Sequence, residues 1–154
     1  MPRECHSYRE YIDRIEENLI RDLKKAYPDI EIYERDSAAD VLETIFEEYD
    51  EQRFIFVFDE WDFIFHKDFI KEEDKKQYIL FLSNLLKDRP YVIMTYMTGI
   101  LPIKKYGTHS ALNMFSEYSM ANPRQLAEYV GFTEEEVEEL CDQYHMNLKE
   151  LKEW

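Results

Sequence analysis

The first pattern that suggests chemistry is a pair of adjacent carboxylates at the end of a strongly apolar segment. Residues 54–58 read Phe-Ile-Phe-Val-Phe, and Asp59 and Glu60 follow directly. An unbroken run of β-branched and aromatic residues predicts a strand that is buried on both faces of a parallel sheet. At the end of such a strand, an aspartate can hold Mg²⁺ beside phosphates, and a glutamate can polarise the attacking water.

A second apolar segment runs from Tyr91 to Met97 and ends in Thr98. Ligands of open α/β sheets bind beyond the carboxyl ends of the strands. If this segment is the neighbouring strand, Thr98 lies at the same edge as Asp59 and Glu60. A polar side chain there can sense the γ-phosphate of a nucleotide, so the three residues together predict a nucleotide site.

A purely structural interpretation of these residues stays open from the spacing alone. Asp59 could be the N-cap of a following turn, with Glu60 and Asp62 solvated around it. An apolar strand followed by Asp-Glu also occurs by chance in many α/β proteins. The choice between the two interpretations depends on where the strands place these side chains.

Alternating helices and strands are expected to position the three candidates. Apolar residues spaced three and four apart predict helices over residues 7–27, 37–49 and 72–87. Two shorter strands are expected at residues 30–33 and 117–120. Helices that alternate with apolar strands predict right-handed βαβ units, and hence an α/β fold with a mostly parallel sheet of about three to four strands.

The C-terminal part of the chain predicts short helices, the first of them at residues 111–115. Capping signals for three more follow: Pro123 with Gly131 at the two ends of one, Thr133 with Glu136 in a capping box, and Asn147 before the last. We expect residues 1–122 to form an α/β core and residues 123–154 to form a C-terminal helical segment of the same domain.

Composition sets the broad class of the protein. The 154 residues suit a single domain, and an apolar content of 45% is that of a folded chain. An excess of 34 Asp and Glu over 19 Lys and Arg gives a net charge of -15, which repels nucleic acid and anionic membranes. The sequence shows no apolar run of membrane length, no signal-peptide pattern and two isolated cysteines. We therefore expect a cytoplasmic protein without direct nucleic-acid or membrane binding.

Other side chains fit weaker hypotheses. Cys141 and His145 are four apart on a predicted helix, which is metal-ligand spacing, but a half-buried cysteine beside a surface histidine is the favoured interpretation. The acidic run at residues 134–139 is interpreted as a solvated helix face. Further candidates for a phosphate-facing role are better explained as polar surface: His66, His109, Lys104, Lys105 and Arg124.

Four separated motifs, in order and at plausible spacing, resemble one family over nearly the whole chain. They read FIFVFDEWDFIF at residues 54–65, MTGILPI at 97–103, KYGTHSALNMF at 105–115 and YVGFTEEEV at 129–137. The chain resembles the bacterial AAA-ATPase-like family, whose members often carry a C-terminal nuclease-like domain of the PD-(D/E)XK type. The resemblance implies a P-loop NTPase-like three-layer sandwich that uses ATP and Mg²⁺. It places Asp59, the metal ligand, and Glu60 at the Walker B positions, and Thr98 at the sensor position.

Two departures from the family pattern shape the functional expectation. The family's domain begins with a strand and a phosphate-binding loop, but no G-x-x-x-x-G-K-[ST] can be written in these residues. The nuclease-like domain is not in the sequence either, so the chain resembles the middle portion of the family's ATPase domain. Because the loop supplies most phosphate contacts, we expect a truncated or degenerate ATPase module that does not hydrolyse ATP alone.

Two alternatives stay open: an ATPase site completed by another chain, and a non-catalytic protein-interaction module on the same scaffold. In P-loop folds of this class, the loop-bearing strand lies next to the sensor strand. Its absence leaves the segment from Tyr91 to Met97 as an apolar sheet edge, which invites pairing. Residues 117–120, another copy of the chain or a partner protein could cover that edge. We expect some association on this ground.

Overall fold

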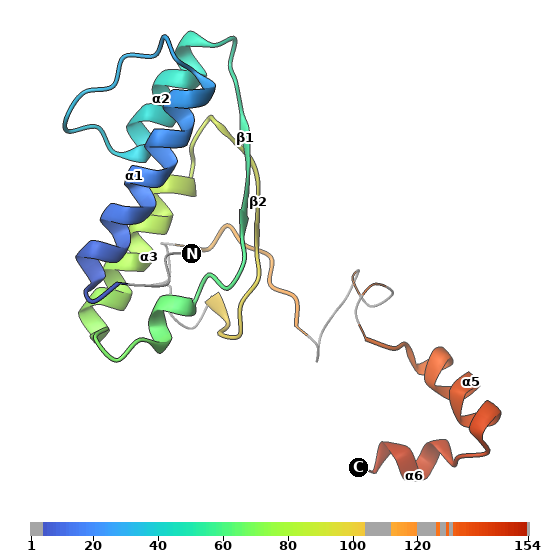
Figure 1. Ribbon diagram of the computed structural model, residues 1–154. Helices are drawn as coiled ribbons and strands as arrows, with labels where there is room; N and C mark the ends of the chain where they lie inside the picture. Colours follow the sequence, from blue (N-terminus) through green and yellow to red (C-terminus); the bar gives the residue numbers. More distant parts are fainter. Residues whose placement is uncertain (1–4, 104–111, 120–125, 127–128, 130, 154) are drawn as a thin grey trace. The chain divides into compact units, whose positions relative to one another are not determined.

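The structure is a computed structural model that describes residues 5–103, 112–119, 126, 129 and 131–153. Its helices and its small parallel sheet make the fold mixed α/β, as the sequence predicts. The chain divides into two compact units, Met1–Phe115 and Ser116–Trp154 (Figure 1). All three predicted site residues belong to the first unit, so its elements decide the geometry of the site.

α1, Tyr8–Ala26, has clear start and stop signals. The hydroxyl of Ser7 accepts a hydrogen bond from the backbone N–H of Glu10, which satisfies one of the free donors of the first turn. The helix ends at Tyr27, because Pro28 disfavours a helical backbone in the residue before it. The first predicted helix is therefore confirmed.

α2, Ala38–Glu48, and α3, Glu72–Leu86, supply most of the core. α2 begins with a capping box, in which Ser37 Oγ accepts from the N–H of Asp40 and Asp40 Oδ2 accepts from the N–H of Ser37. Each helix buries one apolar face: Val41, Leu42 and Ile45 from α2, and Tyr78, Ile79, Leu82, Leu85 and Leu86 from α3. Full burial of such a side chain stabilises the fold by about 1.5–3 kcal/mol, so packing holds these helices in place.

β1, Phe54–Phe58, and β2, Val92–Met97, pair in parallel, with Phe58 opposite Met97 at their carboxyl ends. Between the strands, the chain passes through the short 3₁₀ helix η1, Phe63–His66, and then through α3. A parallel pair needs such a crossover, and a helix supplies it. The two strands and α3 thus form the predicted βαβ unit, which brings both strand ends to one edge.

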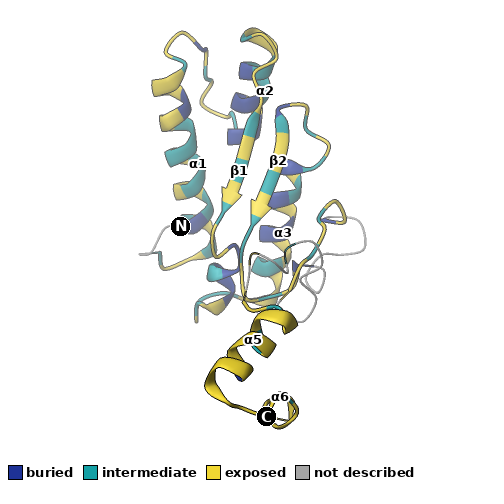
Figure 2. Ribbon diagram, turned by 90° about the vertical axis from the view of Figure 1, so that its right-hand side faces the viewer, coloured by how far each residue is buried: buried dark blue, intermediate teal, exposed yellow. Residues whose placement is uncertain are grey.

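The three α-helices that the structure describes in the first unit, α1, α2 and α3, lie on one side of the sheet (Figure 1). Phe54 and Phe56 pack against the core on that side, whereas Ile55 and Val57 are 58% and 70% exposed. Exposed and half-buried residues alternate along β1 and largely along β2 (Figure 2). This corrects the prediction of strands buried on both faces. Among the residues that the structure describes, helices cover one face only, so the side chains of the other face meet solvent.

The two shorter strands have different outcomes. Residues 30–33 have no regular secondary structure, which corrects the expectation of a strand there. The N–H of Tyr33 donates to Asp36 Oδ2 at 2.7 Å, and Lys24 Nζ donates to the carbonyl of Ile30. Local side-chain bonds thus occupy backbone groups that a sheet ladder needs. At the second, residues 117 and 118 have no regular secondary structure, residue 119 forms an isolated bridge, and residue 120 lies outside the described part of the chain. The additional strands of the predicted sheet stay predictions.

In the second unit, the capping signals define two helices as predicted. Thr133 and Glu136 form a capping box at the start of α5, Glu134–Tyr144. Asn147 caps α6, Leu148–Lys152, by accepting a hydrogen bond from the N–H of the second helical residue. No helix that the structure describes is long and apolar enough to cross a membrane.

The remaining C-terminal predictions can be compared with the structure only in part, because several of their residues lie outside the described part of the chain. Residues 112–114 form a turn where a helical piece is expected, and residue 111 lies outside the described residues. The helix expected between Pro123 and Gly131 falls almost entirely outside them as well. The predicted division at residues 122 and 123 lies within the second compact unit.

Candidate functional site

The carboxyl ends of β1 and β2 bring two predicted site residues into direct contact. The sheet ladder continues past the strands, since the N–H of Thr98 donates to the carbonyl of Phe58 at 2.8 Å. The Thr98 hydroxyl then donates to Oδ1 of Asp59 at 2.5 Å. Asp59 and Thr98 therefore lie side by side at the edge where ligands of parallel sheets bind.

Glu60 forms the sharp turn that follows β1. Its backbone φ is 53°, in the left-handed region that costs a residue with a side chain about 1–2 kcal/mol. In this conformation its N–H faces Thr98, whose hydroxyl oxygen accepts it at 3.3 Å. Four other residues with side chains share this conformation (Asp50, Glu51, Asp88 and His145), so it defines the turn and is not by itself a sign of function.

The two carboxylates offer hard oxygen ligands to a cation. Asp59 and Glu60 are both exposed. Within the described residues, no group of three or more acidic, histidine or cysteine side chains could hold a metal ion. Mg²⁺ commonly takes one or two carboxylates and completes its shell with water and phosphate oxygens. Two neighbouring carboxylates can contribute to such a shell, and a Mg²⁺ site at this edge stays a prediction.

The burial of Asp62 differs from what the structural interpretation expects. It is 2% exposed, so the expectation of a solvated side chain is wrong. It occupies the N-cap position of η1 without a capping bond. Its carboxylate instead accepts from the backbone N–H groups of Ile100 and Leu101 at 3.1 and 2.8 Å. Sequence reasoning missed this residue, although an aspartate enclosed in an aromatic run is a signal that could have found it.

Aromatic residues support the loop after β1 from the core side. Tyr78 of α3 donates its hydroxyl to the carbonyl of Trp61 at 3.0 Å. The ring of Phe65 meets Trp61 and Tyr78 edge-on, with ring centres 5.4 and 5.8 Å apart. Burial raises the pKa of Tyr78 well above its ordinary value, so the hydroxyl keeps its proton and its donor role at neutral pH. The loop that carries Asp59 and Glu60 thus rests on a packed core.

The weaker sequence candidates that the structure describes form no site with Asp59 and Thr98. Cys141 is buried and His145 is exposed at the C-cap of α5, and no metal-binding group of described residues includes them. His66 lies with its Nε2 3.5 Å from Oδ2 of Asp62, so it pairs with the buried carboxylate. The other candidates fall outside the described residues: Lys104, Lys105, His109 and Arg124.

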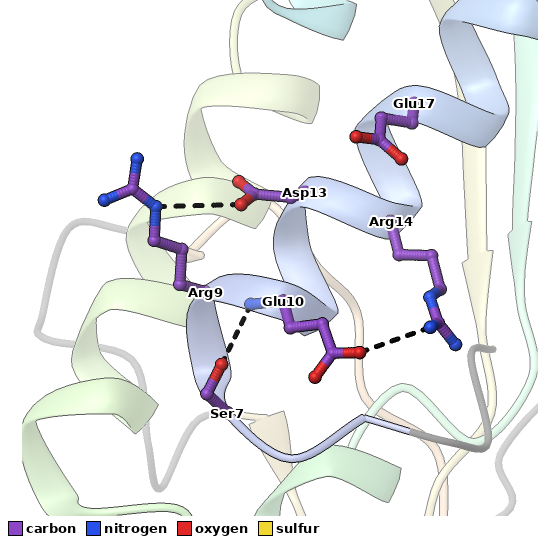
Figure 3. Close-up of a pocket in the computed structure, with 6 residues that line it drawn as sticks. All are labelled: Ser7, Arg9, Glu10, Asp13, Arg14 and Glu17. Atoms are coloured by element: carbon purple, nitrogen blue, oxygen red, sulfur yellow. Dashed lines mark hydrogen bonds and ion pairs between the residues drawn. The ribbon is translucent and has the colours of Figure 1, made fainter.

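A shallow hollow of about 450 Å³ lies elsewhere, along α1 (Figure 3). Six polar residues of the N-terminal half of the chain line it: Ser7, Arg9, Glu10, Asp13, Arg14 and Glu17. Arg9 pairs with Asp13 at 3.6 Å and Arg14 pairs with Glu10 at 3.2 Å. Exposed pairs of this kind contribute little and offer no concentrated charge to a ligand, so the hollow is not the nucleotide site.

Comparison with known proteins adds no evidence on what this site binds. The likeness of the four motifs to the AAA-ATPase-like family therefore stays an interpretation of the residues themselves. Comparison of the chain with models of protein families, with curated proteins and with solved structures found no match.

Proposed function

We propose that this chain is an AAA-like ATPase module that carries the Mg²⁺ and water side of a nucleotide site and does not hydrolyse ATP alone. The observation that carries the proposal is the contact between Thr98 and Asp59 across two neighbouring parallel strands. Two motifs 39 positions apart thus meet at the edge where an α/β sheet binds its ligands. The proposed fold is a P-loop NTPase-like three-layer sandwich with a sheet of about three to four strands, of which β1 and β2 are two.

Each residue has a role that follows from its chemistry. Asp59 contributes a carboxylate oxygen to the shell of Mg²⁺, which neutralises phosphate charge when it is bound. Glu60 accepts a hydrogen bond from the attacking water and polarises it. Thr98 keeps a hydroxyl donor at the edge, where it can leave Asp59 for an oxygen of the γ-phosphate.

Phosphate contacts are what the site lacks. In P-loop proteins, the backbone N–H groups and the lysine of a glycine-rich loop hold the triphosphate, and these 154 residues contain no such motif. Asp59 and Glu60 also stand in a chain of net charge -15, which repels a triphosphate. We therefore expect the chain alone to bind Mg-ATP with a Kd of roughly 1 mM or weaker.

One observation favours completion of the site by another polypeptide. Parallel sheets are normally covered on both faces, and an apolar edge strand is a template for pairing. In the proposed assembly, a second copy of the chain or a partner protein covers this face or the edge of β2. A non-catalytic interaction module uses the same surface without nucleotide. The side chains of the uncovered face are at least half exposed: Ile55, Val57, Ile93, Met94 and Tyr96.

Calorimetric titration of Mg-ATP into the purified chain, with a turnover assay beside it, tests the proposal. The expected result is no measurable binding heat at micromolar protein and no ATP turnover above background. Turnover that the nearly isosteric change Glu60→Gln abolishes would refute the inactivity of the isolated chain. Binding that Asp59→Asn removes would instead favour a working nucleotide-binding protein.

A further inference from the structure

Asp62 is a buried charge that the proposed nucleotide chemistry does not use. It is the only charged side chain buried among the residues that the structure describes. An ionised carboxylate loses a large hydration energy on burial unless hydrogen bonds replace the water. The role of this carboxylate therefore depends on the groups that it contacts. These are two backbone N–H groups and the imidazole of His66.

The two backbone donors come from the other side of the candidate site. Asp62 belongs to the segment after β1, whereas Ile100 and Leu101 belong to the segment after β2. The N–H of Ile100 lies 3.3 and 3.1 Å from the two carboxylate oxygens, and the N–H of Leu101 lies 2.8 Å from one of them. Hydrogen bonds to a charged acceptor are about twice as strong as neutral ones. The carboxylate thus ties together the two segments that carry Asp59 and Thr98.

Gly99 shows how closely the two segments approach. A Cβ at this position would lie 2.5 Å from Cδ1 of Trp61 and 2.6 Å from Oδ1 of Asp62. Both distances are shorter than any van der Waals contact of carbon. The N–H of Trp61 also donates to the carbonyl of Thr98 at 2.9 Å. Only a residue without a side chain leaves room for this junction.

We propose that Asp62 is a positioning residue that fixes the distance between Asp59 and Thr98. Asp59 is exposed and Thr98 is half-buried, so neither side chain has the packing to fix that distance itself. The bonds of Asp62 lie within three residues of both, and its own side chain is buried. The geometric proposal stands by itself, and its importance for Mg-nucleotide rests on the proposed function.

Amide hydrogen exchange of Asp62→Asn tests the proposal. Asparagine keeps the shape of the side chain but loses the charge, so the bonds to Ile100 and Leu101 weaken. We expect exchange at these two amides and at Glu60 to accelerate about 10- to 100-fold, while buried amides of α3 keep their rates. The chemical shift of the Asp59 carboxyl carbon is expected to change as well, because its bond to Thr98 loosens.

Asp68→Asn is the matched control, because it removes one negative charge from an exposed position nearby in the chain. Unchanged exchange at Ile100 and Leu101 together with an unchanged Asp59 shift would overturn the proposal. Equal acceleration at all amides would overturn it too, since Asp62 then acts on global stability alone.

A second variant covers the case in which Asp62→Asn does not fold. Gly99→Ala keeps the carboxylate but forces the two segments apart at the same junction. A changed Asp59 carboxyl shift and faster exchange at Glu60 support the proposal, and the absence of both overturns it. None of these measurements contains nucleotide, so their outcome is independent of whether the chain binds Mg-ATP.

Discussion

The hydroxyl of Thr98 and the carboxylate of Asp59 are joined by a 2.5 Å hydrogen bond across the carboxyl ends of two parallel strands. The register that pairs Phe58 with Met97 places Asp59 and Thr98 at neighbouring positions, because the next residue of each strand follows directly. Side chains alternate between the two faces of a strand, so a slip of one residue would send one of the partners to the other face. The contact is therefore a sensitive reporter of correct strand pairing.

Replacement of Thr98 by valine tests how much the hydrogen bond to Asp59 contributes to the stability of the fold. Valine keeps the branched shape but loses the hydroxyl, which also accepts from the N–H of Glu60, and the exposed residues Asp59 and Glu60 can bond to water instead. We expect a loss of about 1 kcal/mol or less in the free energy of unfolding, measured by urea denaturation. Thr98→Ser keeps the hydroxyl and is the control. A loss of several kcal/mol would show that the hydroxyl contributes more than an exposed hydrogen bond can.

The metal role of Asp59 can be tested with Mn²⁺, a paramagnetic substitute for Mg²⁺. At millimolar Mn²⁺ and ATP, we expect broadening of the amide resonances of Thr98 and Glu60, and weaker broadening there in Asp59→Asn. The asparagine oxygen can still accept the bond from Thr98, so the variant removes charge and keeps geometry. Asp68→Asn should behave like the wild type. Equal broadening at Thr98 in all three proteins would contradict a metal site at Asp59.

The uncovered face of the sheet predicts self-association or partner binding. Val57 is 70% exposed on that face, and a lysine there would have to lose its hydration in any interface. We expect the apparent mass of the wild type to rise with concentration in light scattering, and Val57→Lys to weaken association about tenfold or more. Gln77→Lys, on the exposed side of α3, adds the same charge and serves as the control. A wild-type protein that stays monomeric at high concentration would count against this use of the face.

The capping box of α2 predicts a pH-dependent loss of stability in Ser37→Ala. The hydroxyl and backbone N–H of Ser37 hold the pKa of Asp40 below its ordinary value. A carboxyl group with a lowered pKa in the folded state stabilises the protein above its unfolded pKa of about 3.9, and this stabilisation disappears as the pH falls through the folded value. We expect Ser37→Ala to cost about 1 kcal/mol at pH 7 and less near pH 2.

Urea denaturation at the two pH values measures that difference. Ser37→Thr keeps a capping oxygen and should lose little stability at either pH. An equal loss for Ser37→Ala at both pH values would mean that Asp40 takes no part in the cap.

The helices could be predicted because their signals are local. Ser37 and Thr133 each satisfy a backbone donor three residues away, so a short window of sequence contains both partners of each cap. The meeting of Asp59 and Thr98 could also be predicted, because parallel strands end at a common edge.

The features that sequence reasoning missed depend on partners far along the chain. The donors that bury Asp62 lie 38 and 39 positions away, and no local pattern contains them. The uncovered face of the sheet could not be predicted from a local pattern either. Strands with apolar residues on both sides do not specify which side the helices cover. At residues 30–33 the alternating pattern resembles a strand, but the carboxylate of Asp36 binds a backbone donor that a strand would need.

The left-handed backbone conformation of Glu60 has a consequence for the residues that this position can accept. Glycine adopts this conformation without the steric cost that a side chain brings, so Glu60→Gly is expected to leave the fold intact. Glycine at residue 60 in a related chain would therefore mark a sequence that does not require the carboxylate.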